Sequence, residues 1–166
     1  MGRGESIGSW EEGVVDDLQD AVLITSYLST GPAATLARLR CSRAEIERGR
    51  RIGEFRGQEP DPSLGVDVRR WMAKVGEAVD DLVAIAVAEG SGAELDDAVE
   101  AVRNSAAPLT IGDLAVDGTD LMGIGVVQGP ALGQLLAGLL DEVLVDPTLN
   151  TKPRLLARAA AMKLTG

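Results

Sequence analysis

One stretch of this 166-residue chain has the glycine content of a loop that cradles a dinucleotide pyrophosphate. It runs from Gly123 to Gly129 (GIGVVQG). In the dinucleotide fingerprint the glycines follow a fixed spacing at the end of a strand, because the backbone must approach the phosphates closely. Here the third glycine comes one position late, and no strand–helix–strand pattern surrounds it. The sequence therefore favours a glycine turn that leads into a helix over a dinucleotide site.

Carboxylates offer a second kind of chemistry. Asp113, Asp117 and Asp120 have the oxygen ligands that Mg²⁺ takes, but they lie beside glycine and threonine in turn-forming sequence. That setting favours helix-capping carboxylates. The adjacent pairs Asp80-Asp81 and Asp96-Asp97 are interpreted as solvent-exposed helix faces, since neighbours on a helix point apart. No catalytic constellation emerges from these residues.

Composition excludes several functions. The chain has no histidine, which rules out Ser-His-Asp and Cys-His catalysis and any metal bound through imidazole. The single thiol, Cys41, cannot form an internal disulfide and is interpreted as a small hydrophobe between helices. Four aromatic residues provide no repeated platform for stacking bases. Charge or glycine interrupts the apolar runs, so we expect no membrane span and a cytoplasmic protein.

The net charge of −10 is unevenly distributed. Residues 38–56 carry seven arginines and three acids, and residues 150–166 carry four basic residues and no acid. Between them, residues 75–149 carry fourteen acids and one arginine. A polyanion would be repelled by most of this chain but could be held at the two basic segments, with Arg69, Arg70 and Lys74 as a third place. Alternatively, each cation could simply complement a helix C-terminus.

Apolar spacing and capping patterns predict an all-α protein. Helices are expected at 10–28, 33–40, 43–55, 66–89, 93–105 and 130–145, and from about 152 onward, with a turn-rich stretch at 109–121. Ser42 and Glu45 have the spacing of a capping box, and Gly76 is expected to kink or divide the long helix. The segment 57–65 (GQEPDPSLG) is the clearest linker.

The C-terminal part of the chain contains a glycine-rich pattern at Asp113, Leu114, Gly118, Asp120, Leu121, Gly125, Gly129, Pro130, Gly133 and Leu136. This pattern resembles the C-terminal region of the bacterial tRNA nucleotidyltransferase (CCA-adding enzyme) and poly(A) polymerase family. Two upstream pieces are similar to family segments in the same order: one begins LRCSRAEI at Leu39, and the other begins VRRWMAKVG at Val68. The resemblance covers about residues 33–163.

The resemblance implies a multi-helix array like the family's body and tail, which grip tRNA by shape and phosphate contacts. It divides the chain into a poorly matching N-terminal helix (1–30), a segment following the phosphohydrolase-like region (31–57), body helices (66–107) and tail helices (108–166). Gly118 and Gly125 are expected to adopt positive φ, Gly129 and Pro130 to start a helix, and Gly133 to admit a neighbouring helix closely.

The chain lacks the patterns of the family's catalytic head: the Gly-Ser loop, the paired metal-binding aspartates and the nucleotide-selecting segment. Mg²⁺ and CTP or ATP would belong to such a head, so we expect no cofactor and no nucleotide addition by this chain alone. The sequence therefore predicts a non-catalytic tRNA-binding portion, truncated or free-standing. The expected phosphate contacts are Arg48, Arg51, Arg69, Arg70, Lys152, Arg154 and Arg158. The alternative is a helical interaction protein that docks a separate catalytic chain, or a degenerate remnant; the oligomeric state stays open.

Overall fold

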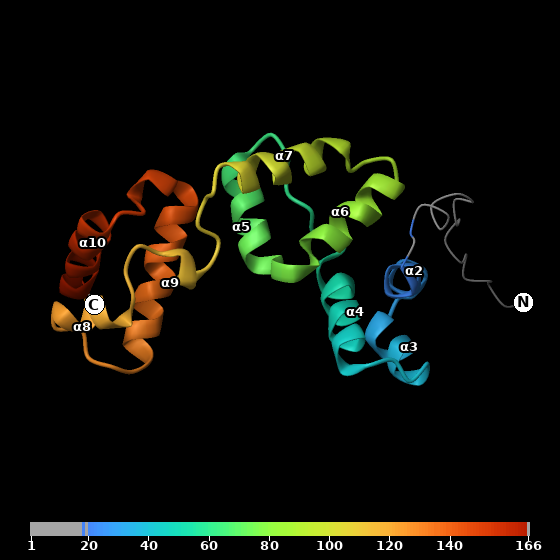
Figure 1. The fold of residues 1–166 in the computed structure, drawn as a ribbon, viewed down its shortest axis with the longest axis horizontal. Helices are drawn as coiled ribbons and strands as arrows, with labels where there is room; N and C mark the ends of the chain where they lie inside the picture. The colour runs from blue at the N-terminus through green and yellow to red at the C-terminus, as the bar shows by residue number, and fades with distance from the viewer. Residues whose placement is uncertain (1–17, 19, 166) are drawn as a thin grey trace, which may run out of the picture. The chain divides into compact units, whose positions relative to one another are not determined.

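The structure is a computed structural model that describes residue 18 and residues 20–165 (Figure 1). This part of the chain is helical and contains no strand, which confirms the all-α prediction. None of its helices is both long and apolar enough to cross a membrane. The helices are α2 (Ala21–Leu28), α3 (Pro32–Arg38), α4 (Arg43–Phe55), α5 (Gly65–Val75), α6 (Val79–Ala88), α7 (Ala93–Asn104), α8 (Gly118–Gly123), α9 (Pro130–Val145) and α10 (Lys152–Thr165), with 3₁₀ turns at Gly76–Ala78, Ile111–Asp113 and Pro147–Leu149.

The chain forms two compact units. Among the described residues, the first contains those up to residue 59 together with 77–96, and the second contains residues 60–76 and 97–165. The boundary between 59 and 60 falls inside the segment expected to be a linker. Residues 66–107, expected as one set of body helices, are shared between the two units.

In the first unit, α2, α3 and α4 pack on one another, and α6 contacts both α2 and α4. Leu36, Ile52, Leu82 and Ile85 are almost fully buried, at 0–2 % exposure. These side chains come from α3, α4 and α6, so apolar burial holds together helices that are distant in the sequence.

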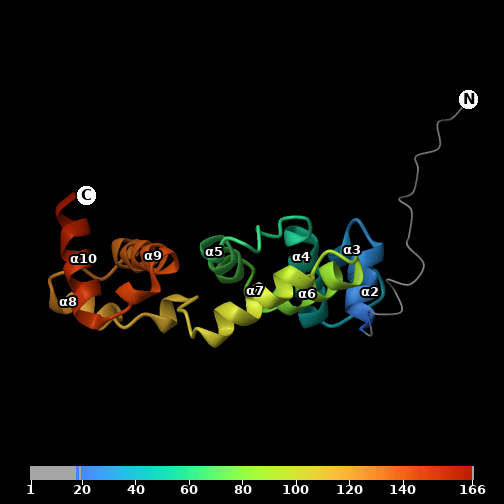
Figure 2. The same ribbon diagram turned by 90° about the horizontal axis from the view of Figure 1, so that it is seen from above.

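In the second unit, α8, α9 and α10 lie beside one another (Figure 2). They enclose an apolar core. Its buried members are Leu114, Val116, Leu121, Leu139, Val143, Leu155 and Ala159. The helix α5 packs against α9 in the same unit. The dense leucine and valine pattern at 130–145, expected as one helix, is α9 over that same range.

Most helix boundaries follow local sequence signals. Ser42 and Glu45 form the expected capping box, in which the Ser42 backbone N–H donates to the Glu45 carboxylate over 2.6 Å. Pro32 and Pro130 occupy first helical positions, where a missing N–H costs nothing. Gly76 has φ of +64° and ends α5 before α6 begins, so the long apolar pattern at 66–89 is divided as expected.

Two expectations about local structure are wrong, and a third is confirmed only in part. The helix expected from Trp10 starts outside the described residues, and within them helical structure begins only at Ala21, because the Asp20 carboxylate accepts hydrogen bonds from the N–H groups of Val22 and Leu23. The stretch 109–121 is turn-rich as expected up to residue 117, where the 3₁₀ turn Ile111–Asp113 lies, but its last residues belong to the short helix α8. Asp81, expected to be exposed, is only 7 % exposed, whereas Asp80, Asp96 and Asp97 are exposed as expected.

The glycines of the C-terminal pattern take different roles from one another. Gly125 has φ of +84°, as expected, and Gly129 precedes Pro130 with φ of +149° at the start of α9. Gly118 does not have positive φ; it lies in the first turn of α8, where an added Cβ would be 3.3 Å from Leu132 Cδ2. No described atom lies within 4 Å of a Cβ built on Gly133, so the expected close helix approach is wrong.

Candidate nucleic-acid interface

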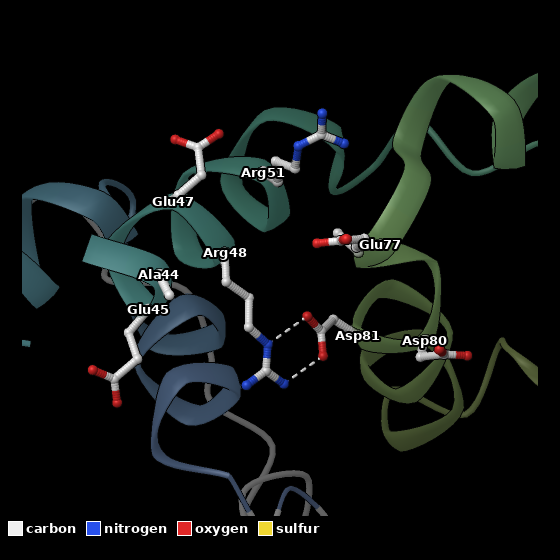
Figure 3. A pocket seen from close by; sticks show the side chains of 9 residues that line it. Ala44, Glu45, Glu47, Arg48, Arg51, Glu77, Asp80 and Asp81 are labelled. Atoms are coloured by element: carbon white, nitrogen blue, oxygen red, sulfur yellow. Dashed lines mark hydrogen bonds and ion pairs between the residues drawn. The ribbon is translucent and has the colours of Figure 1, made fainter. Parts of the chain in front are cut away.

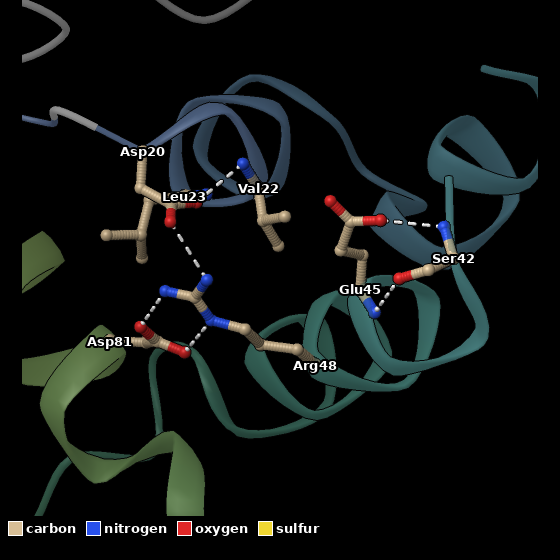
Figure 4. Close-up of polar contacts among 7 residues, drawn as sticks. All are labelled: Asp20, Val22, Leu23, Ser42, Glu45, Arg48 and Asp81. Carbon is tan, nitrogen blue, oxygen red and sulfur yellow. Dashed lines mark hydrogen bonds and ion pairs between the residues drawn. The ribbon is translucent and has the colours of Figure 1, made fainter. Parts of the chain in front are cut away.

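Arg48, on α4, is held by two carboxylates of the first unit (Figure 4). Its Nε and Nη2 atoms donate to Asp81 over 2.7 and 2.6 Å, and its Nη1 atom donates to Asp20 over 3.0 Å. These bonds, those to Asp81 above all, raise the pKa of Arg48. The guanidinium therefore joins α4 to α6 and to the start of α2, and its side chain is 36 % exposed.

A cavity of about 600 Å³ lies beside this ion pair (Figure 3). Arg48 on α4 points toward Asp81 on α6, whereas Asp80, the neighbour of Asp81, points away from both side chains. The cavity is lined by Ala44, Glu45, Glu47, Arg48, Arg51, Glu77, Ala78, Asp80 and Asp81. Carboxylates outnumber guanidiniums here, so the cavity is electrostatically unsuited to a phosphate group.

The neighbours Arg69 and Arg70 on α5 lie in different surroundings. Arg69 donates from Nε to the Leu144 carbonyl over 2.7 Å and from Nη2 to the Val145 carbonyl over 3.1 Å. These are the last two residues of α9, so Arg69 satisfies carbonyl groups that the helix leaves unpaired. Arg70 is exposed, and its side chain has no hydrogen-bond or ion-pair partner within residues 20–165.

Three expected phosphate contacts share α10, and each has a local partner. Lys152 Nζ is 2.5 Å from Asp120 Oδ1, and Arg154 donates from Nη1 to the Thr148 carbonyl over 2.9 Å. Arg158 Nε lies 2.9 Å from Glu142 Oε2, but the angle is not that of a hydrogen bond. The ion pair with Lys152 lowers the pKa of Asp120 and raises that of Lys152.

The aspartates considered as Mg²⁺ ligands act as helix caps instead. Asp117 accepts from the Asp120 N–H over 2.9 Å, and Asp113 accepts from both the backbone and the hydroxyl of Thr110. The Thr110 hydroxyl, more than the backbone N–H groups, lowers the pKa of Asp113. Within the described residues no three His, Cys, Asp or Glu side chains are grouped so as to hold a metal. The capping interpretation is confirmed.

The sequence reasoning missed three exposed arginines: Arg38 ends α3, Arg40 lies in the turn that follows, and Arg43 starts α4. They were counted within the basic segment 38–56 but not singled out as contacts. Charge alone could not separate them from Arg48 or Arg50, because pairing depends on which carboxylates the fold brings near. The positive φ of Arg40 is likewise a feature of the folded turn.

The chain matches no family model, no curated protein and no solved structure in the three comparisons made. A functional assignment therefore depends on where the described cations lie and on the motif resemblance.

Proposed function

We propose that this chain is a non-catalytic, tRNA-binding helical portion of a tRNA nucleotidyltransferase-like protein. The motif resemblance suggests the family, and the arrangement of charge on the second unit supports contact with a structured polyanion. In this proposal the chain contacts the phosphates of the RNA and makes no sequence-specific contact with its bases, as is usual for structured RNA.

The observation that carries the proposal is the basic face of α10. This helix contains no acidic residue and buries Leu155 and Ala159, both at 0 % exposure. Lys152, Arg154 and Arg158 are exposed, with side chains of Lys152 and Arg158 more than half exposed. The helix is thus anchored by its apolar side and presents cations to solvent on an otherwise acidic unit.

The partners of these cations do not prevent phosphate binding. Exposed ion pairs contribute about 0–1 kcal/mol each and weaken with salt, so they exchange readily for a phosphate. Arg70 is exposed without a recorded partner in the described chain. Arg48 and Arg69 are less available to a phosphate than these cations, because their hydrogen bonds join separate helices. The geometry therefore favours four cations as the phosphate contacts: Arg70, Lys152, Arg154 and Arg158. Arg51 is not among them, because it lies at the edge of the acidic cavity.

A salt-dependent filter-binding assay with tRNA tests the proposal. Each lost phosphate contact lowers the slope of log affinity against log salt by about 0.7–0.9. A variant with Lys152, Arg154 and Arg158 changed to Gln is expected to bind more weakly, with a slope reduced by about two. The Arg50→Gln and Arg103→Gln variant removes two exposed, paired cations and serves as the control. Absence of tRNA binding by the wild-type chain at low salt would refute the proposal.

Docking of a separate protein chain is the second candidate, and one observation favours it. Val127 is 80 % exposed and lines an apolar groove of about 580 Å³ in the second unit. The other lining residues are Gly125, Val126, Ala131, Gln134, Leu135 and Met162. A Val127→Ser variant that keeps full tRNA affinity but loses co-purification with a nucleotidyltransferase head would support docking.

A further inference from the structure

The turn between α3 and α4 carries three exposed arginines whose side chains have no partner in the described part of the chain. These are Arg38 at the end of α3, Arg40 in the turn, and Arg43 at the start of α4. Other arginines of the same basic segment are paired: Arg48 with Asp81, Arg50 with Glu47 and Glu54, and Arg56 with Glu89. We call Arg38, Arg40 and Arg43 the basic turn.

Arg40 occupies a backbone conformation that normally belongs to glycine. Its φ is +60°, and the turn is closed by Cys41 N–H donating to the Leu36 carbonyl and Arg40 N–H donating to the Ala37 carbonyl, both over 3.1 Å. This is the helix-ending geometry in which glycine is preferred, because a Cβ crowds the backbone at positive φ. Glycine would adopt this backbone conformation with less strain. The Arg40 side chain makes no contact within the described residues that would offset the strain.

The carboxylates closest in sequence do not neutralise the basic turn. Glu45 accepts hydrogen bonds from the Ser42 backbone in the capping box, and Glu47 pairs with Arg50 over 2.8 Å. Three exposed guanidiniums without a described partner therefore lie within six residues of an acidic protein.

We propose that the basic turn is a phosphate-contact site for the backbone of a structured RNA. This inference rests on the proposed function and adds a contact place in the first unit. A guanidinium fork matches the oxygens of a phosphate, and three of them within six residues suit the closely spaced charges of a nucleic-acid backbone. Stable membrane attachment would need a lipid chain or an amphipathic apolar face beside the cations, and Leu39 is the sole large apolar side chain between them.

An Arg40→Gly variant separates binding from folding. Glycine relieves the backbone strain, so the midpoint of thermal unfolding is expected to stay the same or rise. The affinity for tRNA is expected to fall about threefold at moderate salt, from loss of one phosphate contact. A purely structural role for Arg40 would instead lower the unfolding midpoint and leave the tRNA affinity of the folded protein unchanged. That result would overturn the inference.

The variant with Arg38→Gln, Arg40→Gly and Arg43→Gln tests the whole basic turn on the full chain. We expect at least tenfold weaker tRNA binding and a salt slope reduced by about two, against no change in the Arg50→Gln and Arg103→Gln control. Wild-type binding with an unchanged affinity in the triple variant would overturn this inference and leave the proposed function standing. No wild-type binding would overturn both. Binding of vesicles containing anionic lipid that depends on these arginines, with no effect on tRNA, would also overturn it.

Discussion

Arg48 and Asp81 form a two-bond guanidinium–carboxylate pair between α4 and α6, with Nε–Oδ2 and Nη2–Oδ1 distances of 2.7 and 2.6 Å. Asp81 is 7 % exposed, so Arg48 is the counter-charge of a carboxylate that is largely removed from water. Asp20 accepts a hydrogen bond from the third guanidinium nitrogen, Nη1. One arginine thus links three helices whose residues lie up to 61 positions apart in the chain.

An Arg48→Gln variant is expected to destabilise the first unit. The substitution leaves the Asp81 carboxylate buried without its counter-charge, which costs several kcal/mol when a pair is fully buried. Because the arginine is about one-third exposed, we expect a smaller loss of about 1–3 kcal/mol in the free energy of unfolding. Urea denaturation measures it. Arg50→Gln, which removes an exposed cation from the same helix, should leave the midpoint in place; equal effects of the two variants would contradict this assignment.

The stability contributed by Asp20 should depend on pH. Burial raises the pKa of Asp20, but hydrogen bonds from Arg48 and from the Leu23 and Val22 N–H groups lower it more, so the net value lies below the ordinary 3.8. A lowered pKa stabilises the folded state above pH 3.8, and that stabilisation is lost as pH falls through the folded value. Asparagine keeps the N-cap acceptor. Asp20→Asn should therefore be less stable than wild type at pH 7, with the difference vanishing in acid; a difference independent of pH would contradict this.

Gly92 lies where the chain turns from α6 into α7 and leaves no room for a side chain. A Cβ built there would be 2.3 Å from the Val87 backbone nitrogen and 2.5 Å from the Ala86 carbonyl carbon. Backbone atoms cannot rotate aside as a side chain does. Gly92→Ala should cost about 3 kcal/mol, the upper end for overpacking, in denaturant unfolding. An unchanged midpoint would show that the turn can open.

Gly133 on α9 should respond in the opposite direction. It is exposed, and an added Cβ would meet no described atom within 4 Å. Alanine has a higher helix propensity than glycine, so Gly133→Ala should raise the free energy of unfolding by about 0.5–1 kcal/mol. Thermal unfolding of the second unit measures the change. A loss of stability would indicate that this face of α9 packs against something within the chain after all.

Helix positions followed from the sequence wherever a local signal decided them. The Ser42 capping box, the Pro130 start of α9 and the break at Gly76 depend on neighbouring residues alone, and all three are confirmed. The capping of Asp117 and Asp120 is of the same kind. Local capping hydrogen bonds and the backbone preferences of proline and glycine therefore predicted these boundaries.

The surroundings of the cations could not be predicted in this way. Whether Arg48 or Arg70 is available depends on carboxylates brought near by tertiary packing, and Arg69 donates to carbonyl groups 75 and 76 residues away. Asp81 looked like an exposed helix residue because its partner is 33 positions distant. Charge counting identified the basic segments correctly but could not distinguish an arginine that joins helices from one that faces solvent.

Asn150 provides a last test, in the second unit. Its Oδ1 atom accepts from the Ala115 N–H over 2.8 Å, and its Nδ2 atom donates to the Asp113 carbonyl over 2.9 Å. One side chain thereby satisfies two backbone groups of the segment that leads into α8. Asn150→Ala removes both bonds and should cost about 1–2 kcal/mol in denaturant unfolding. Asn150→Asp keeps the acceptor but places a carboxylate against the Asp113 carbonyl, so it should be destabilising at pH 7 and recover in acid, where the protonated group donates again. A difference in stability from wild type that is the same at both pH values would show that the bond to Asp113 contributes nothing.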